Sequence, residues 1–280
     1  MITYNPKEWF SLIFLFHKSD TFRRLFWVML AVALYSAIIV YLEVEVLHNV
    51  KSSGVLIYNL LGFVIALLLV FRTNTAYERW WEGRRQWGAL VNCSRNLAIK
   101  ILAFIPGEVK EKEELLQLVP QFSSALAAHL RSGKIEGFPK DVHQPNHIAL
   151  EIYRLISQLK TDGHIDETQF RMLDLEAAEF TDICGGCERI KKSPIPFSYS
   201  TFIKKFIFIY VMTMPFSFVE YRYAMIPVVV FVLYVLTSLE LIAEEIEEPF
   251  GIDTNDLPID EMVATIHSNI RELKGAKAVG

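Results

Sequence analysis

Long apolar stretches separated by charged segments dominate the pattern along the chain. The first stretch, Leu25 to Leu42, contains no charged residue. At a rise of about 1.5 Å per residue, its length approaches the hydrocarbon thickness of a bilayer. Glu43 and Glu45 follow it, where a signal peptide would have a cleavage site of small residues. The pattern therefore predicts a transmembrane helix and not a cleaved leader.

A second apolar stretch, Val55 to Phe71, comes after a short polar loop. Beyond Phe71 the pattern stays helical to about Phe104, and no proline interrupts it. Roughly 50 residues of helix would measure about 75 Å, which is more than twice the hydrocarbon thickness. We therefore expect the second helix to leave the membrane and to continue far into the cytoplasm.

Two further apolar stretches, Phe206 to Val219 and Ala224 to Leu239, predict a second transmembrane hairpin. Pro215 and Pro227 lie within these stretches and are expected to kink the helices, which packing against neighbouring helices can tolerate. Residues 106–200, between the two hairpins, have mixed charge, amphipathic helical periodicity and no spanning stretch. This middle part is expected to be a cytoplasmic helical region.

Basic residues near the ends of the spans predict their orientation. Arg23 and Arg24 precede the first span, and Lys204 and Lys205 precede the third. Because cytoplasmic loops carry an excess of lysine and arginine, both termini are expected in the cytoplasm. The predicted organisation is an interfacial N-terminal segment (1–24), a transmembrane hairpin whose second helix extends into the cytoplasm (25–105), a cytoplasmic helical region (106–200), a second transmembrane hairpin (201–243) and a cytoplasmic tail (244–280). The expected fold class is all-α, an integral membrane protein with four transmembrane helices per subunit.

The composition agrees with a chain divided between membrane and water. Of its 280 residues, 52% are hydrophobic and 21% are charged. This is too apolar for an ordinary soluble domain and too charged for a bundle that lies wholly in lipid. The formal net charge of -4 leaves no basic excess to neutralise phosphates, so nucleic acid is not an expected partner. No nucleophile with its base, phosphate loop or histidine pair lies inside the spans, so an enzyme is not expected.

The three cysteines have little predicted chemistry. Cys184 and Cys187 have the spacing of half a tetrahedral metal site, but Cys93 lies far away in the sequence. Three thiols cannot make a disulfide framework, and they fit a reducing compartment. A metal or redox role is therefore not favoured for them.

Two other groups of residues are expected to be structural. His143 and His147 are four residues apart, but Pro145 between them argues against a shared helix face, so metal ligation is not favoured. The charged run at 111–114 is expected to be a solvated helix start.

The segment from Phe71 to Gly88 has the most unusual composition in the chain. Four arginines, two glutamates and three tryptophans gather on one predicted helix just past the bilayer. One interpretation is an interfacial belt, with tryptophans at headgroup level and arginines on lipid phosphates. The other is packing between subunits around a pore. The residues that either interpretation would use are Arg72, Asn74, Arg79, Trp80, Trp81 and Glu82.

Four motifs together give the chain a resemblance to the bestrophin family of ion channels. They are Leu61-Gly62-Phe63, then Phe71-Arg72-Thr73-Asn74 through Arg79-Trp80-Trp81-Glu82-Gly83-Arg84, then Ser193-Pro194-Ile195-Pro196-Phe197-Ser198-Tyr199, and finally Glu248-Pro249-Phe250-Gly251 followed by Asp253, Asn255 and Asp256. The motifs occur in family order and at family-like separations over nearly the whole chain. The resemblance implies a bestrophin-like homopentamer whose second spanning helices surround a central pore. It also implies a narrow neck in the membrane and a second constriction in the cytoplasmic part.

The resemblance carries the neck positions onto Val55, Asn59 and Phe63. Their spacing of i, i+4 and i+8 puts them on one helix face, as a pore-lining stripe requires. An alignment shifted by one residue would place Leu56 and Leu60 there instead. The plain alternative for this face is contact with lipid or with neighbouring helices.

Asn59 departs from the neck expected of the family, which is commonly all aliphatic and aromatic. An amide inside a membrane helix needs a partner or water, so Asn59 is a functional candidate. A ring of five such amides would make the neck wetter. A gate that closes purely by dewetting is then in doubt.

The Pro194-Ile195-Pro196 segment cannot lie inside a helix, because each proline lacks an amide hydrogen and disfavours helix in the residue before it. The plain interpretation is a loop that joins the cytoplasmic region to the third span. By resemblance, Ile195 lines the cytoplasmic constriction and projects a branched side chain toward the five-fold axis.

Acidic residues gather after the fourth span. In animal bestrophins a more continuous acidic run at this place helps to bind calcium. This chain has only Asp253, Asn255 and Asp256 in the corresponding segment. Pro258 stands where the turn glycine of an EF-hand would be. A calcium site is therefore less favoured than a helix end followed by a capped turn, and no cofactor is required.

The resemblance predicts a passive channel for small monovalent ions, with chloride and other anions favoured over sodium or potassium. A secondary transporter or another non-channel membrane protein is the alternative. However, the two hairpins share no repeat, and the core of the second span is unbroken. The expected partners are further copies of the chain, membrane lipid and the permeant ions. The expected setting is the inner (plasma) membrane of a prokaryote, as a multi-pass protein.

Overall fold

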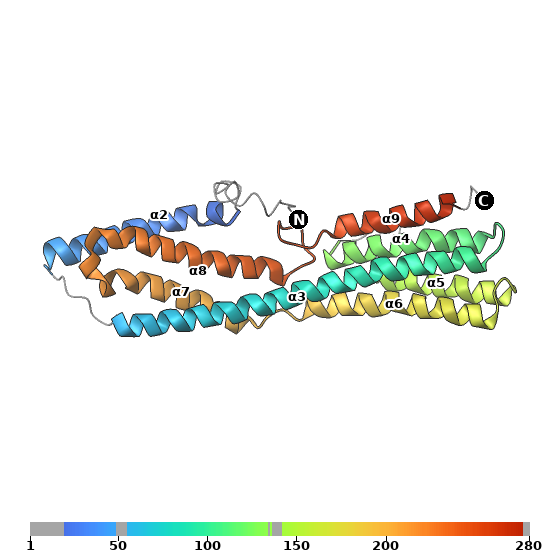
Figure 1. Ribbon diagram of the computed structural model, residues 1–280, viewed down its shortest axis with the longest axis horizontal. Coiled ribbons are helices and arrows are strands. Elements are labelled where there is room, and N and C mark those ends of the chain that lie inside the picture. Colours follow the sequence, from blue (N-terminus) through green and yellow to red (C-terminus); the bar gives the residue numbers. More distant parts are fainter. Residues whose placement is uncertain (1–19, 49–54, 134, 136–141, 277–280) are drawn as a thin grey trace. The chain divides into compact units, whose positions relative to one another are not determined.

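The computed structural model describes residues 20–48, 55–133, 135 and 142–276, and the elements within these ranges are all helices (Figure 1). Most of the predicted interfacial segment 1–24 lies outside the described residues. The chain divides into two compact units. Described residues up to 78 together with 195–247 form the apolar unit, and residues 79–194 together with those from 248 onward form the amphipathic unit. Helix α3 (Val55–Phe104) contributes its first part to the apolar unit and its second part to the amphipathic unit.

The apolar unit is a bundle of hydrophobic helices. Besides the start of α3, it contains α2 (Asp20–Tyr41), the π-helical turn η2 (Leu42–Val46), α7 (Phe197–Ser217), the 3₁₀ turn η3 (Val219–Ala224) and α8 (Met225–Glu247). α2 packs against α7 and α8, and α7 packs against α8. Tyr58, Ile65 and Leu69 of α3 belong to the same buried cluster as Val211 of α7 and Val229 of α8.

Three of the described helices are long and apolar enough to cross a membrane: Thr21–Val46, Val55–Phe104 and Val219–Glu247. They contain the first, second and fourth spans predicted from the sequence. α7 contains the predicted third span up to Ser217 but is not among these three. Pro227 lies in the first turn of α8, where a missing amide hydrogen breaks no helical bond, so it begins this helix rather than kinking it.

The amphipathic unit is a second helical bundle with its own core. It contains the end of α3, α4 (Lys110–Leu130), α5 (Gln144–Thr161), α6 (Glu167–Lys192) and α9 (Ile259–Ala276). α4 packs against α5, α6 and α9, and α5 packs against α6. Asp166 and Gln169 form a reciprocal capping box that starts α6. The helical character predicted for residues 106–200 is confirmed.

The charged start of α4 is not fully solvated, and this corrects the expectation for residues 111–114. Lys112 is buried, and its Nζ donates to the backbone oxygens of Ile105 and of Gly107, the latter at 3.3 Å. These carbonyls follow the end of α3, where the last helical C=O groups have no partner within the helix. The positive φ of Gly107 (75°) helps the chain to turn back toward the lysine.

Replacing Phe180 by alanine is expected to lower the free energy of unfolding by about 3–5 kcal/mol, because it removes a fully buried ring from the core. The Phe180 ring meets that of Phe122 edge to face, with 4.9 Å between centroids. Denaturant unfolding followed by tryptophan fluorescence measures the loss. Leu175→Ala on the same helix is the control, since Leu175 is 68% exposed and should change stability by about 0.5 kcal/mol or less. Equal losses would contradict this assignment of the core.

Candidate functional site

The residues predicted for the pore neck lie on an outward face of α3. Val55, Asn59 and Phe63 are all exposed, with exposed fractions of 37% for Val55 and 67% for Phe63. Tyr58 and Ile65, on another face of the same helix, are buried within the chain. The stripe is therefore free to face a pore or lipid. The alternative positions at 56 and 60 are exposed as well, so the choice of register stays a prediction.

A close contact between α3 and α7 fixes which face of α3 points outward. A Cβ atom on Gly62 would come within 2.9 Å of the hydroxyl oxygen of Tyr210, so a larger residue there would push this hydroxyl aside. The Tyr58 hydroxyl donates to the backbone oxygen of Tyr210 at 3.2 Å, and it also contacts the Thr213 hydroxyl. The contacts of Gly62 and Tyr58 with α7 thus fix how α3 is rotated about its own axis, and in this orientation Asn59 is exposed.

Arg72 lies inside its own chain and not at the surface. Its side chain is 1% exposed, and its Nη2 lies 2.6 Å from an oxygen of Glu247. Its Nε lies 3.5 Å from an oxygen of Glu240, which is also buried. Its motif predicts contact with lipid or another subunit, whereas the structure pairs Arg72 with two carboxylates of α8. One arginine therefore forms ion pairs with two buried carboxylates.

This arginine cluster also holds the turn that carries Ile195. The backbone N–H of Ile195 donates to Oε1 of Glu247 at 2.7 Å, while Oε2 of the same carboxylate pairs with Arg72. α6 ends at Lys192 and α7 begins at Phe197, so the prediction that the proline segment is not helical is confirmed. Ile195 is half-buried in the single chain. The hydrogen bond to Glu247 therefore holds the backbone of Ile195, while part of its side chain stays exposed.

Arg79 caps the end of α6 within the amphipathic unit. Its guanidinium donates to the backbone oxygens of Ile190, at 2.7 Å, and Ser193. These carbonyls belong to the C-terminal end of α6, where a cation compensates for unpaired C=O groups and the helix dipole. Asn74 and Trp81 are exposed, so contact with lipid or another subunit stays a prediction for them.

Trp80 and Glu82 make contacts within the chain. The indole N–H of Trp80 donates to the backbone oxygen of Asn255 at 3.0 Å. Glu82 accepts from Gln86 at 2.8 Å and pairs with Arg85 on the same helix. The tryptophan therefore links α3 to the segment after Pro249. Glu82 contacts its own helix and also lies 4.0 Å from Nη2 of Arg189 on α6.

The acidic segment after α8 forms a compact turn. Asp256 is buried, and its Oδ2 accepts from the backbone N–H of Asp253 at 2.6 Å. A Cβ atom on Gly251 would meet the same oxygen at 2.5 Å, so the turn needs glycine there. Asp253 and Asn255 are exposed. The carboxylate of Asp256 is thus used to cap the turn, as the favoured interpretation of the sequence expects. Calcium binding by these three residues stays the less favoured alternative.

A cavity of about 410 Å³ lies beside this turn, and most of the charges around it are positive. Arg79, Arg131 and Lys191 line it, against the single carboxylate of Glu248. Arg131 donates to both oxygens of Asp260, at 2.7 and 3.1 Å, and these bonds hold the pKa of Asp260 below its usual range. The cavity therefore suits anions better than cations.

The cysteines of α6 are packing residues. Cys184 and Cys187 are free and buried. Burial raises the pKa of Cys184 to about 12 and that of Cys187 well above its usual range. Thiols that stay protonated react slowly. Between them, a Cβ atom on Gly186 would come within 2.8 Å of Gln86, so α6 packs closely on α3.

Sequence reasoning missed Glu240 as a partner of Arg72. The signal that could have revealed it is its position, since Glu240 and Glu247 are seven residues apart and therefore share a face of α8. Arg72 directly follows one apolar stretch of the sequence and Glu240 directly follows another, which favours a buried ion pair.

Two compact helical units, one of them built from apolar helices long enough to span a bilayer, define a helical membrane protein. The chain matches the family model of the bacterial and fungal bestrophin proteins over residues 1–272, and it belongs to that family. The family assignment made from the four motifs is confirmed.

Similar proteins cover most of the chain. A voltage-dependent anion channel-forming protein of Synechocystis is 36% identical over 76% of this chain and 75% of its own length. A protein of the same description from Nostoc is 32% identical over 97% of this chain and 94% of its own. A crystal structure of a bacterial bestrophin homologue from Klebsiella pneumoniae has a TM-score of 0.82 at 28% identity, covering 90% of this chain and 99% of that one. The bestrophin-like fold is therefore confirmed.

Proposed function

We propose that the chain is one subunit of a homopentameric channel through which small monovalent ions pass passively, with anions favoured over cations. The observation that carries the proposal is the exposed stripe of Val55, Asn59 and Phe63 on α3. The resemblance gives the pore neck to these positions, and since α3 buries another face, that of Tyr58 and Ile65, they are free to line it. The anion-channel names of relatives that match most of this chain support the same class of function.

In this proposal α2, the first part of α3, α7 and α8 cross the membrane, and both termini lie in the cytoplasm. Three of these helices have the length and apolar composition of a span. The proposed location is the plasma membrane. The preference for anions is supported by the cationic lining of the cavity beside Phe250. No resident cofactor is needed, and calcium is not required for conduction.

A secondary transporter is the weaker alternative. Transporters commonly bind their substrate where a transmembrane helix is broken near the midplane. α3 runs without a break from Val55 to Phe104, and its exposed stripe is apolar apart from one amide. Such a helix suits a pore wall better than a substrate site.

Flux from proteoliposomes tests the proposed function. Vesicles that contain the purified protein and are loaded with KCl should release chloride, as measured with a chloride electrode, and the rate should not saturate with concentration as a carrier's does. Native mass spectrometry of the same preparation should show five subunits. A verified pentamer that releases no ion at any voltage or calcium concentration would contradict the proposal.

Ile195→Ala is expected to change the permeability ratios among anions of different size. Removing a branched side chain from a constriction lowers the barrier for a large anion more than for chloride, and a difference of about 1 kcal/mol corresponds to about fivefold. Reversal potentials under mixed-anion conditions measure the ratios. Ile99→Ala, at an exposed isoleucine of α3 within the amphipathic unit, is the control. Identical ratios in wild type and Ile195→Ala would remove Ile195 from the selectivity role.

A further inference from the structure

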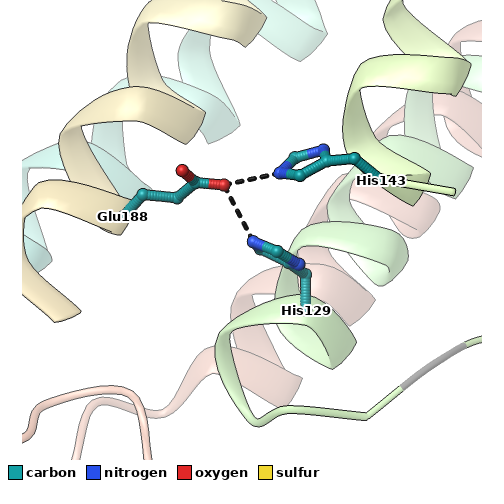
Figure 2. Close-up of side chains that lie close together, drawn as sticks. All are labelled: His129, His143 and Glu188. Atoms are coloured by element: carbon teal, nitrogen blue, oxygen red, sulfur yellow. Dashed lines mark hydrogen bonds and ion pairs between the residues drawn. The ribbon is translucent and has the colours of Figure 1, made fainter. Parts of the chain in front are cut away.

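Three side chains from three helices of the amphipathic unit meet at one point (Figure 2). His129 lies in the last turn of α4, His143 is the N-cap residue of α5, and Glu188 lies near the end of α6. One carboxylate oxygen of Glu188 lies 2.8 Å from Nε2 of His129 and 2.5 Å from Nε2 of His143. The two imidazole rings lie side by side, with 4.3 Å between their centroids.

Sequence spacing gave no hint of this cluster. The spacing of His143 pairs it only with His147, and Pro145 between them does not favour ligation. In the structure His143 meets residues 14 and 45 positions away. Among the residues that the structure describes, these three form the one group of histidine, cysteine or acidic side chains with three potential ligand atoms all within 4.8 Å of one another.

The donor set matches the chemistry of a divalent transition metal. Two neutral imidazole nitrogens and one carboxylate oxygen suit zinc, which binds such ligands at about 2.0–2.2 Å and accepts water as a fourth ligand. Tetrahedral ligands at that bond length are separated by about 3.3 Å. The present nitrogen–oxygen separations are 2.5 and 2.8 Å, so the side chains need to move apart by less than about 1 Å.

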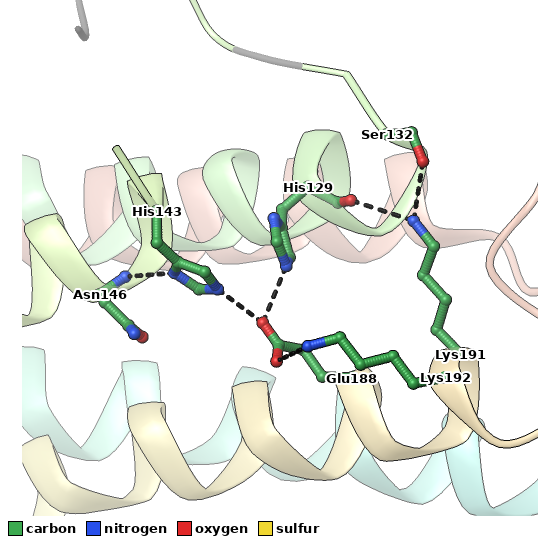
Figure 3. A network of polar contacts seen from close by, with 7 residues as sticks. All are labelled: His129, Ser132, His143, Asn146, Glu188, Lys191 and Lys192. Carbon is green, nitrogen blue, oxygen red and sulfur yellow. Dashed lines mark hydrogen bonds and ion pairs between the residues drawn. The ribbon is translucent and has the colours of Figure 1, made fainter. Parts of the chain in front are cut away.

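Neighbouring groups hold two of the three side chains in position (Figure 3). Lys192 donates to the second oxygen of Glu188 at 2.7 Å, which leaves the first oxygen turned toward the histidines. Lys191 donates to the Ser132 hydroxyl at 2.9 Å and to the backbone oxygen of His129 at 3.3 Å, which fixes the end of α4. Such contacts from surrounding residues orient ligands and reduce the reorganisation that metal binding requires.

The third side chain, His143, would lose a hydrogen bond and gain a bond to the metal. Nδ1 of His143 accepts from the backbone N–H of Asn146 at 3.2 Å and so caps α5. A metal on Nε2 of a neutral imidazole leaves the proton on Nδ1, so this long hydrogen bond would be lost. Asn146 is exposed, and its N–H can bond to water instead. The coordination bond to the metal outweighs this loss.

We propose that His129, His143 and Glu188 form a binding site for a divalent transition-metal ion, with zinc the best match to its ligands. The three side chains are partly exposed, at 31%, 33% and 19%, so an ion and its water ligand can reach them. A bound ion would join the end of α4, the start of α5 and the end of α6. Glu188 lies six residues before Pro194, which is less than two helical turns, so the ion would stiffen the helix that leads into the Ile195 turn.

Isothermal titration calorimetry on the full-length protein, stripped with EDTA and dialysed, tests the site directly. We expect one zinc ion per subunit and a rise in melting temperature with ZnCl₂ that equal concentrations of MgCl₂ or CaCl₂ do not give. His129→Gln, His143→Gln and Glu188→Gln should each weaken zinc binding at least about tenfold. His164→Gln, at an exposed histidine outside the cluster, should bind as wild type does.

Cobalt provides a readout that does not depend on stability. Co²⁺ added to the stripped wild-type protein should give the visible absorption of a tetrahedral site, and the Glu188→Gln protein should lose this absorption even where its helical circular dichroism is unchanged. Absence of both zinc binding and the cobalt spectrum in wild type would overturn the proposal. Equal zinc binding by wild type and a variant with all three residues replaced would overturn it as well. Ion conduction is not part of either readout, so the result is independent of the proposed function.

Discussion

An aspartate at position 59 is expected to move the reversal potential of the channel toward the potassium equilibrium potential. In the proposed pentamer, Asn59→Asp replaces five neutral amides by five carboxylates on the exposed face of α3. Rings of acidic side chains are a device by which channels select cations. A difference of only about 1.4 kcal/mol between the barriers for the two ions changes the permeability ratio about tenfold. Bi-ionic reversal potentials in a planar bilayer measure this ratio.

Two further variants separate the effect of position 59 from an effect of charge alone. Asn96→Asp adds the same charge to the same helix, at an exposed site within the amphipathic unit, and should leave the permeability ratio close to that of wild type. Asn59→Leu makes the neck drier and should lower conductance without favouring cations. If conductance and selectivity are unchanged in both Asn59 variants, Asn59 does not face the pore.

Arg72→Ala is expected to destabilise the protein by about 3–5 kcal/mol, because it leaves the buried carboxylates of Glu240 and Glu247 without their cation. The variant should also loosen the Ile195 turn, since the oxygen that accepts from the Ile195 amide belongs to Glu247. Thermal unfolding in detergent and the yield of folded protein measure the loss.

An exposed ion pair and a double variant provide the controls for Arg72. Lys204 and Glu244 lie 2.8 Å apart but are about half exposed, so Lys204→Ala should cost about 1 kcal/mol or less. Adding Glu247→Gln to Arg72→Ala removes one of the two buried negative charges that Arg72 balances and should restore part of the lost stability. Simple addition of the two separate losses would show that Arg72 does not act through this carboxylate.

Features encoded by neighbouring residues could be predicted from the sequence. The predicted extent of the second helix, to about Phe104, is confirmed because its apolar and polar pattern is unbroken until Pro106 and Gly107. The non-helical turn at 194–196 follows from the covalent structure of proline. The exposed position of Asn59 agrees with the helix face expected of it, and its place in a pore stays a prediction.

Features that depend on distant residues could not be predicted in the same way. The burial of Arg72 depends on Glu240, which is 168 residues away and which only the packing of α3 against α8 brings near. Lys112 has the charge of a solvated residue, yet the end of α3 offers it backbone oxygens. His129 and Glu188 have no spacing pattern in common, because their meeting depends on how α4 and α6 pack.

The reversal potential across a tenfold KCl gradient tests the central claim most directly. The purified protein is reconstituted in a planar bilayer, and current is recorded over a range of voltages with calcium and with EGTA. The proposal predicts steady current that reverses near the chloride equilibrium potential in both conditions. Reversal near the potassium equilibrium potential would contradict the preference for anions, and no current from a verified pentamer would contradict the channel itself.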